Sequence, residues 1–374
     1  MTRKNVLIFS HSPAIQFIEI NNNYTKLFDP QKWKVTVAYF MERGTEEIIQ
    51  KHCAEEIIFL NTPRKSARGL KWFAIQRMLR LHRERNFEIV FCHRYQPGYV
   101  MVVVSLFKKI SRLFIIKHDV RAMKRVGRRL FLALFFPKNA IFVGVSNAVR
   151  EDLRRSLWNI SHDRIITLYN CMDIEKYEKK LLSREEARQA LGLSPDSFLF
   201  GSIARLDWDK DHANTIKAFS SIHSSCPHSM LMIIGAGAKD AELKKQAAES
   251  HVDQHVIFKG FIEDAFRYIA AFDVYVSSAL KEAFGLALIE AMFSKIPVIA
   301  TAVDGAVEVV GDVGMLVNPK KSDELASHML RLFQLNKEQR AHIGNKGHTR
   351  VKNQFSLEAF KNTFWALELM REIA

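Results

Sequence analysis

Residues 274–301, VYVSSALKEAFGLALIEAMFSKIPVIAT, contain the pattern that decides the fold. Short apolar runs at 274–277 and 297–301 have the length of buried strands, and residues 286–293 between them show a helical apolar pattern. A strand, a helix and a second strand in this order predict a right-handed crossover between parallel strands. Glu282 lies in the loop before the helix and Glu290 lies within it.

The same alternation extends along the whole chain. A charged segment at residues 171–194, poor in β-branched residues, separates two halves that repeat it. Further strand-like runs occur at residues 5–10, 34–40, 56–60, 87–93, 113–118, 140–146, 164–169, 197–203, 229–234 and 255–259. Helical patterns occur at 71–85, 148–157, 211–224, 240–250, 323–335 and 337–353. We predict an α/β protein of two tandem Rossmann-like domains, residues 1–180 and 181–355, followed by a C-terminal helix over 356–374.

The composition is that of an ordinary globular protein, with 48% hydrophobic and 25% charged residues in 374. No run reaches the roughly 18 apolar residues that span a bilayer. The start of the chain, MTRKNVLIF, contains too few consecutive apolar residues for the core of a signal peptide. The four cysteines form no CxxC pair, which argues against a metal site and indicates a reducing, cytoplasmic location.

The charge is concentrated in the first half of the chain. Residues 1–180 hold 33 Lys and Arg against 16 Asp and Glu, whereas the remainder holds 22 against 24. Within residues 101–150 the count is 11 against 1. A one-sided basic field attracts an anionic partner, which leaves acidic lipid, nucleic acid and phosphorylated substrates as candidates.

In the second half, polar residues follow the predicted strands, where open α/β sheets bind ligands. The free N–H groups at Gly285 and Leu286 suit a phosphate, and the carboxylates of Glu282 and Glu290 suit sugar and ribose hydroxyls. The alternative is an ordinary amphipathic helix with a charged start. Arg205 and Lys210 have the charge to neutralise a diphosphate, or else they are solvated loop residues paired with neighbouring aspartates.

Three further features remain open between a structural and a functional interpretation. Gly235-Ala236-Gly237 is a GxG turn between a strand and a helix, which permits close backbone approach or only marks a tight turn. His93 and His118-Asp119 close two strands of the first half. A histidine at such a place hydrogen-bonds or exchanges protons with a substrate hydroxyl, although a lone histidine is often structural.

Taken in order, ARLDWDKD, IIGAGA, EAFGLALIEAMFSKIPVIAT, AVDGAVEVV and GMLVNPKKSDELA resemble the C-terminal domain of family-4 retaining glycosyltransferases with the GT-B fold. The N-terminal half resembles the same family in KHD at 117–119, VSNAVRE at 145–151 and YNCMD at 169–173. The resemblance implies two Rossmann-like domains facing across a cleft, with a C-terminal helix that crosses back to the first domain. The first would bind the acceptor and the second the nucleotide sugar.

The resemblance also implies roles for individual residues. Arg205 and Lys210 would bind the donor diphosphate, Glu282 the donor sugar and Glu290 the ribose. His118 would lie beside the reacting sugar. Gly235, Ala283, Phe284, Gly285 and Leu286 would complete the donor site, while His93, Asp119 and Asn170 would lie on the acceptor side or at the hinge. The co-substrate would be a nucleotide sugar, UDP-linked in preference to GDP-linked, and the reaction would need no metal and no other cofactor.

One departure from the family pattern concerns the loop after the first strand. Members often have a Gly-Gly loop there that touches phosphate, whereas this chain has His11-Ser12-Pro13-Ala14. Cys171 also replaces the usual glycine, and Lys281 stands where proline is common. The loop at His11 thus lacks the glycines of the family's phosphate contact, and none of these changes removes a charged donor residue.

The acceptor should meet the basic first half. Residues 108–129 contain a cation every two or three positions and are followed by the apolar run LFLALFF at 130–136. This pattern suits a peripheral enzyme on an anionic membrane, inside the plasma membrane, that glycosylates a glycan or a glycolipid of the lipopolysaccharide type. A core helix with solvated flanks is the alternative for the same residues.

Three other functions fit parts of the pattern. A nucleotide-sugar epimerase of the same fold would turn over the donor without an acceptor. A non-catalytic sugar-binding protein would be expected to have lost the carboxylates and cations that this chain retains. A basic nucleic-acid-binding protein would explain the charge, but the chain has no zinc pattern, RNP motif or KH loop, and we expect no nucleic-acid partner.

Overall fold

The computed structural model describes residues 3–41, 44–63, 65–67, 69–120, 123, 125–194 and 197–370. The chain forms two compact units, each described here by itself. The first unit comprises Met1–Cys171 together with Phe360–Ala374, and the second comprises Met172–Ala359. The end of the chain therefore belongs to the first unit. No helix within the described ranges has the length and apolar character that crossing a bilayer requires.

The first unit is built on a parallel sheet in the order β3-β2-β1-β4-β5-β6-β7. β1 (Lys4–Ser10) lies in its interior, paired with β2 and β4, and Val6, Leu7, Ile8 and Phe9 on it have no exposed surface. The other strands are β2 (Trp33–Tyr39), β3 (Glu56–Phe59), β4 (Phe87–His93), β5 (Arg112–Lys117), β6 (Ala140–Gly144) and β7 (Ile165–Thr167). Strands that are apolar on both faces belong to parallel sheets covered by helices.

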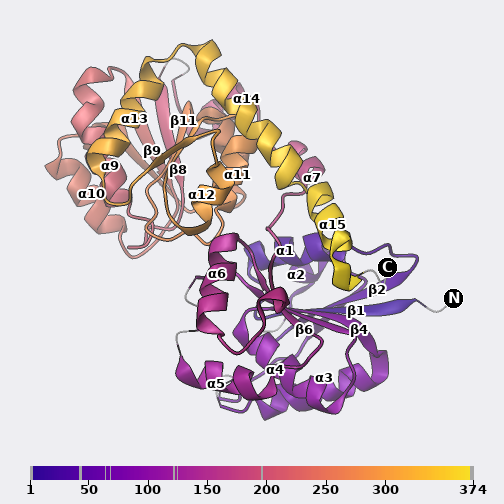
Figure 1. Ribbon diagram of the computed structural model, residues 1–374. Helices are drawn as coiled ribbons and strands as arrows, with labels where there is room; N and C mark the ends of the chain where they lie inside the picture. The colour runs from indigo at the N-terminus through magenta and orange to yellow at the C-terminus, as the bar shows by residue number, and fades with distance from the viewer. Residues whose placement is uncertain are drawn as a thin grey trace. The chain divides into compact units, whose positions relative to one another are not determined.

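Helices cover both faces of this sheet. Its helices are α1 (Ile15–Thr25), α2 (Glu46–Gln50), α3 (Trp72–Arg85), α4 (Tyr95–Phe107), α5 (Val126–Phe135) and α6 (Asn147–Ser156). In Figure 1, α1 lies on one face of the sheet, and α3, α4 and α5 lie side by side along the other. Among α3, α4 and α5, α5 is the least buried, since Leu132 is its single buried residue.

The second unit repeats the architecture with the parallel order β10-β9-β8-β11-β12-β13. Its strands are β8 (Phe198–Ile203), β9 (Ser229–Ile234), β10 (Val256–Gly260), β11 (Val274–Ser277), β12 (Val298–Thr301) and β13 (Met315–Val317). Its helices are α7 (Ile174–Glu178), α8 (Arg184–Leu191), α9 (His212–Ile222), α10 (Asp240–Glu249), α11 (Leu286–Phe293), α12 (Asp304–Val310), α13 (Ser322–Gln334) and α14 (Lys337–Gln354). The predicted fold class of two parallel Rossmann-like domains is thus confirmed.

The charged segment at 171–194 contains regular structure. α8 begins with a capping box in which Ser183 and Glu186 exchange hydrogen bonds with each other's backbone N–H groups. Arg188 on α8 is 4% exposed and pairs with Asp273 at 2.9 Å. Because a buried arginine needs such a partner, α8 is tied firmly to the start of β11.

The C-terminal helix differs from the prediction. α15 (Leu357–Ala366) ends well before residue 374, and a short 3₁₀ turn (Glu368–Met370) follows it. Hydrogen bonds from Leu367 N to Phe364 O and from Met370 N to Leu367 O tighten the chain there. The expected single helix was therefore wrong in this respect, because the tighter turn brings Met370 into the buried interior. The last four positions, 371–374, lie outside the described residues.

Candidate functional site

In the second unit, the loops that follow β8 and β11 are joined by hydrogen bonds. Leu280 N donates to Asp209 O at 2.8 Å. The buried Ser278 Oγ lies 3.1 Å from Lys210 O and 2.7 Å from Asp211 O. Both loops leave the carboxyl ends of neighbouring strands, which pair in the sheet. The fold therefore brings the residues around Arg205 and Lys210 to those around Glu282.

Lys210 and Glu282 form an ion pair across these two loops, with Nζ 2.6 Å from Oε2. Their side chains are 18% and 22% exposed, so the pair is only partly screened by water. Arg205 is 68% exposed and pairs within its own loop, at 2.5 Å to Asp207 and 3.5 Å to Asp209. The two predicted cations thus differ, because Lys210 is anchored across the site and Arg205 is exposed and paired within its own loop.

Glycines let the backbone segments approach closely here. A Cβ on Gly235 would lie 1.9 Å from Ala204 O, and one on Gly237 would lie 2.4 Å from Leu206 O. The GxG turn therefore packs backbone to backbone against the loop after β8, where a side chain would not fit. Gly285, with φ +102°, occupies the N-cap position of α11, where L side chains are strained.

The loop at Glu282–Phe284 rests on the start of α12. Gly305 N donates to Glu282 O at 2.8 Å, and a Cβ on Gly305 would lie 2.3 Å from Ala283 O. Glu282 N donates to Asp304 Oδ2 at 3.4 Å. Phe284 is 3% exposed and packs edge-on against Phe355. This support fixes the backbone of Ala283 and Phe284 in front of Leu286, the first residue of α11.

Glu290 lies on α11 and accepts a hydrogen bond from Tyr177 Oη at 3.1 Å. Burial raises the pKa of Glu290, the tyrosine hydrogen bond lowers it and nearby Asp264 raises it, and together they bring it to about 7. The carboxyl group therefore titrates near neutral pH, as groups at functional sites often do.

In the first unit, His93 and His118 contact each other at the ends of β4 and β5. His93 Nδ1 lies 2.9 Å from His118 Nε2, so one ring donates to the other. Burial lowers the pKa of His118 to about 3, helped by the charges of Arg94 and Lys117, and it holds the pKa of His93 well below its ordinary value. Both rings are therefore neutral at pH 7 and act as hydrogen-bonding groups.

The remaining predicted residues occupy the same unit. Asp119 follows His118 and is exposed. Asn170 is 9% exposed and precedes Cys171, whose carbonyl accepts a hydrogen bond from Asn23 Nδ2 at 3.0 Å. In the loop without glycines, His11 stacks on Phe40 with ring centroids 5.8 Å apart. An aromatic stack thus occupies the region where the family pattern would place a Gly-Gly loop.

Sequence reasoning missed several residues that support or extend the site. Tyr177 lies in the segment taken as the break between domains, and nothing in its sequence context marks it as a partner of Glu290. Gly305 and Asp304 stand in the quoted AVDGAVEVV motif, but their contact with Glu282 depends on the turn after β12. Lys117 also stands in a quoted motif, KHD, and the single signal was a lysine inside an otherwise apolar strand.

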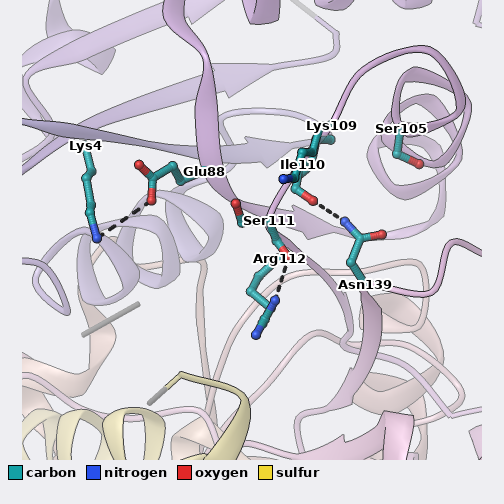
Figure 2. Close-up of a pocket in the computed structure, with 8 residues that line it drawn as sticks. All are labelled: Lys4, Glu88, Ser105, Lys109, Ile110, Ser111, Arg112 and Asn139. Atoms are coloured by element: carbon teal, nitrogen blue, oxygen red, sulfur yellow. Dashed lines mark hydrogen bonds and ion pairs between the residues drawn. The ribbon is translucent and has the colours of Figure 1, made fainter. Parts of the chain in front are cut away.

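A separate cavity of about 580 Å³ lies in the first unit, away from all of these residues (Figure 2). It is lined by Lys4, Glu88, Ser105, Lys109, Ile110, Ser111, Arg112 and Asn139. Lys4 and Arg112 begin β1 and β5, so the cavity is at the amino ends of the strands. The predicted residues follow the carboxyl ends, where ligands of such sheets bind.

Two family models match the chain. "Glycosyl transferases group 1" matches residues 183–350 and "Glycosyltransferase Family 4" matches residues 23–176. Among curated relatives, the N-acetylgalactosamine-N,N'-diacetylbacillosaminyl-diphospho-undecaprenol 4-alpha-N-acetylgalactosaminyltransferase of Campylobacter jejuni is 27% identical over 71% of this chain and 71% of its own length. The capsular polysaccharide biosynthesis glycosyltransferase CapM of Staphylococcus aureus is 25% identical over 78% of this chain and 80% of its own.

Solved structures show the same fold. A glycosyltransferase from Rickettsia africae superposes with a TM-score of 0.85 at 18% identity, covering 100% of this chain and 99% of its own. Anabaena HepE in complex with UDP superposes with a TM-score of 0.78 at 19% identity, covering 96% and 98%. At these identities the likeness is one of fold.

Proposed function

The chain belongs to the family-4 glycosyltransferases of the GT-B fold, and on that premise we propose that it moves a sugar from a nucleoside diphosphate sugar to a hydroxyl group of a glycan or glycolipid. The observation that carries the proposal is the Lys210–Glu282 pair, at 2.6 Å, between loops joined by backbone hydrogen bonds. It places a cation for a diphosphate beside a carboxylate for sugar hydroxyls, next to the start of α11.

The donor's parts are assigned to separate groups of the second unit. Lys210 and the exposed guanidinium of Arg205 neutralise the charge that develops on the leaving diphosphate, which is where electrostatic stabilisation accelerates such a reaction most. Glu282 accepts hydrogen bonds from the sugar, and Glu290 from the ribose. Backbone N–H groups at Gly285 and Leu286 face the distal phosphate.

His118 acts in the first unit as a neutral hydrogen-bonding group for the reacting sugar. Its low pKa excludes the imidazolium form at pH 7, so it does not add positive charge beside a positively charged sugar in the transition state. His93 fixes the orientation of its ring through the 2.9 Å contact. We further propose that transfer retains the donor's anomeric configuration, needs no metal, and uses a UDP-sugar in preference to a GDP-sugar.

The printed names of the relatives suggest an acceptor class. The Campylobacter enzyme is named for a sugar carried on diphospho-undecaprenol, and the Staphylococcus protein for capsular polysaccharide. We propose that this chain works in bacterial cell-surface glycan synthesis, of which lipopolysaccharide is one form, on a glycan or lipid-linked sugar.

A thermal-unfolding panel with UDP-, GDP-, ADP- and CMP-sugars tests the donor assignment. Binding raises the unfolding temperature by mass action, so one family of sugars should raise it by several degrees. No shift with any of the four would overturn the proposal. Proton NMR of the product reports the anomeric configuration, and EDTA should leave the rate unchanged. Conversion of the donor sugar without an acceptor would show an epimerase instead.

Membrane association is a separate part of the proposal. Val126, Leu130 and Leu134 repeat every four residues on α5 and are 74%, 59% and 68% exposed. Arg125, Arg129 and Lys138 lie beside them, and the charge complements an anionic lipid surface. Co-sedimentation with vesicles should retain the protein when they contain 30% phosphatidylglycerol and release it in Leu130→Ser/Leu134→Ser. Equal retention by neutral vesicles would contradict it.

A further inference from the structure

Three cationic side chains lie close to two tyrosine rings in the first unit. Lys71 Nζ lies 4.4 Å from the ring centroid of Tyr99. Lys117 Nζ and Arg128 Cζ lie 5.2 and 4.2 Å from the centroid of Tyr95, and the two tyrosine rings are 6.1 Å apart. We call Lys71, Tyr95, Tyr99, Lys117 and Arg128 the tyrosine–cation cluster.

Neither lysine of the cluster forms an ion pair with another described residue. Lys71 and Lys117 are 9% and 2% exposed. Lys71 Nζ donates to Gly69 O at 2.9 Å, and no carboxylate of the described residues lies within ion-pair distance of either lysine. Asp119 is near enough to raise the pKa of Lys117, but burial and Arg128 outweigh it and lower that pKa to about 7.

Such an arrangement is costly in the isolated protein. Burying a cation without an ionic partner disfavours its charged form, and a second cation nearby adds repulsion. Lys71 also has φ +54°, a left-handed conformation that is uncommon for lysine and recurs at functional sites. Cation–π contacts with the tyrosines compensate for part of the cost. A bound anion would compensate for the rest.

We propose that the tyrosine–cation cluster binds a phosphate or diphosphate group of the acceptor. This inference rests on the proposed function and adds the substrate class at the acceptor side. Two lysines and an arginine suit the multiple charge of a phosphate, and the guanidinium offers paired N–H donors to its oxygens. The cluster is separate from the donor residues, which lie in the other unit.

α5 links this cluster to an apolar surface. Arg128 faces Tyr95, and the Phe131 ring lies 4.5 Å from that of Tyr99. Val126, Leu130 and Leu134 of the same helix remain exposed. A ligand with a phosphate head and a hydrocarbon tail matches this order of charged and apolar groups. The acceptor is therefore a phosphorylated molecule. Its phosphate belongs either to a lipid or to a free sugar phosphate.

Titration calorimetry with geranyl diphosphate, in saturating UDP to fill the donor site, tests the cluster. We expect binding by the wild-type protein and at least tenfold weaker binding by Lys71→Met and by Lys117→Met. Arg77→Met on α3 is the matched control, since Arg77 is exposed and lies over Phe73 outside the cluster, and it should bind as the wild type does. No binding by the wild type, or unchanged binding by both lysine variants, would overturn the proposal.

Two further measurements sharpen the result. If inorganic pyrophosphate binds as tightly as geranyl diphosphate, the natural ligand is a free phosphate. If inorganic pyrophosphate binds more weakly, the natural ligand is a lipid. An anion should also raise the pKa of Lys117, which faces Arg128, Asp119, Cys92 and Tyr95. Binding at pH 8 should then be accompanied by proton uptake. The measured heat of binding should therefore depend on the buffer, and this dependence should be absent in Lys117→Met. Titration of UDP alone tests the donor site independently.

Discussion

The two units handle charge in opposite ways at their proposed binding sites. In the second unit, Lys210 pairs with Glu282, Arg205 pairs with two aspartates, and Glu290 is hydrogen-bonded to Tyr177. In the first unit, the lysines of the tyrosine–cation cluster have aromatic faces for neighbours and no carboxylate partner among the described residues. Lys210 and Arg205, the balanced edge, have carboxylate partners before any ligand arrives, whereas Lys71 and Lys117, the unbalanced edge, have none within the described residues.

The difference suggests two ways of binding an anion. A balanced site holds its loops in place and exchanges an internal partner for the ligand, so its groups are preorganised. An unbalanced site stores repulsion that the ligand relieves, so its groups oppose folding and favour binding. Substitutions at the two edges should therefore have opposite effects on stability, and the predictions below test that contrast.

The largest effect is expected at Lys210. Lys210→Met removes the cation nearest Glu282 and leaves that partly buried carboxylate unpaired, so we expect sugar transfer to fall by about 10²–10³-fold. The initial rate with a nucleotide sugar measures it. Lys239→Met breaks an exposed pair with Glu242 in the same unit and should change the rate less than twofold. A Lys210→Met enzyme with normal turnover would remove Lys210 from the catalytic site.

Gly305 tests whether the donor loop depends on close backbone packing. In Gly305→Ala the new Cβ would meet Ala283 O at 2.3 Å, so the loop at Glu282–Phe284 must move. We expect a loss of about 3 kcal/mol in the free energy of unfolding and at least tenfold weaker UDP binding. Gly127→Ala is the control because its Cβ meets nothing within 4 Å. If both variants bind UDP normally, the loop is not held by this contact.

The sequence predicted most of the fold because buried strands of parallel sheets are apolar on both faces. The runs at 87–93 and 274–277 agree with β4 and β11 residue for residue. The same runs contain no information on the turn that tightens after Ala366, since that turn depends on where Met370 finds buried space. α8 was also missed, because its charged surface resembles a linker until Asp273 is placed beside it.

The candidate site was predictable where a motif is continuous in sequence. Glu282, Gly285 and Glu290 follow from one stretch, and Lys210 from another. Tyr177 and Gly305 reach the site through contacts between distant segments, which no local pattern reports. The tyrosine–cation cluster was visible only as an excess of positive charge, because it depends on which lysines are buried and which lack a carboxylate.

Lys117→Met tests the unbalanced edge through stability. The pKa of Lys117 in the folded protein, about 7, lies below its ordinary value of 10.5, so its charge opposes folding below pH 7 and the penalty disappears as the pH rises toward 10.5. We expect the variant to be more stable than the wild type by about 2 kcal/mol at pH 6. The gap should close toward pH 10. Urea unfolding measures it, and a less stable variant at pH 6 would mean that the lysine is structural.

The smallest effect is expected at Glu290 of the second unit. Its pKa of about 7 lies above its ordinary value, so the buried carboxyl favours the folded state below about pH 4.5, and that contribution is lost as the pH rises through 7. UDP affinity should rise about threefold from pH 6 to 8, because the carboxylate is the better acceptor for ribose hydroxyls. Tyr177→Phe removes the hydrogen bond that lowers the pKa and should move the midpoint to higher pH. Calorimetry of the wild type and of Glu290→Gln separates the titration of Glu290 from that of UDP itself. If UDP affinity has the same pH profile in both proteins, the ribose binds elsewhere.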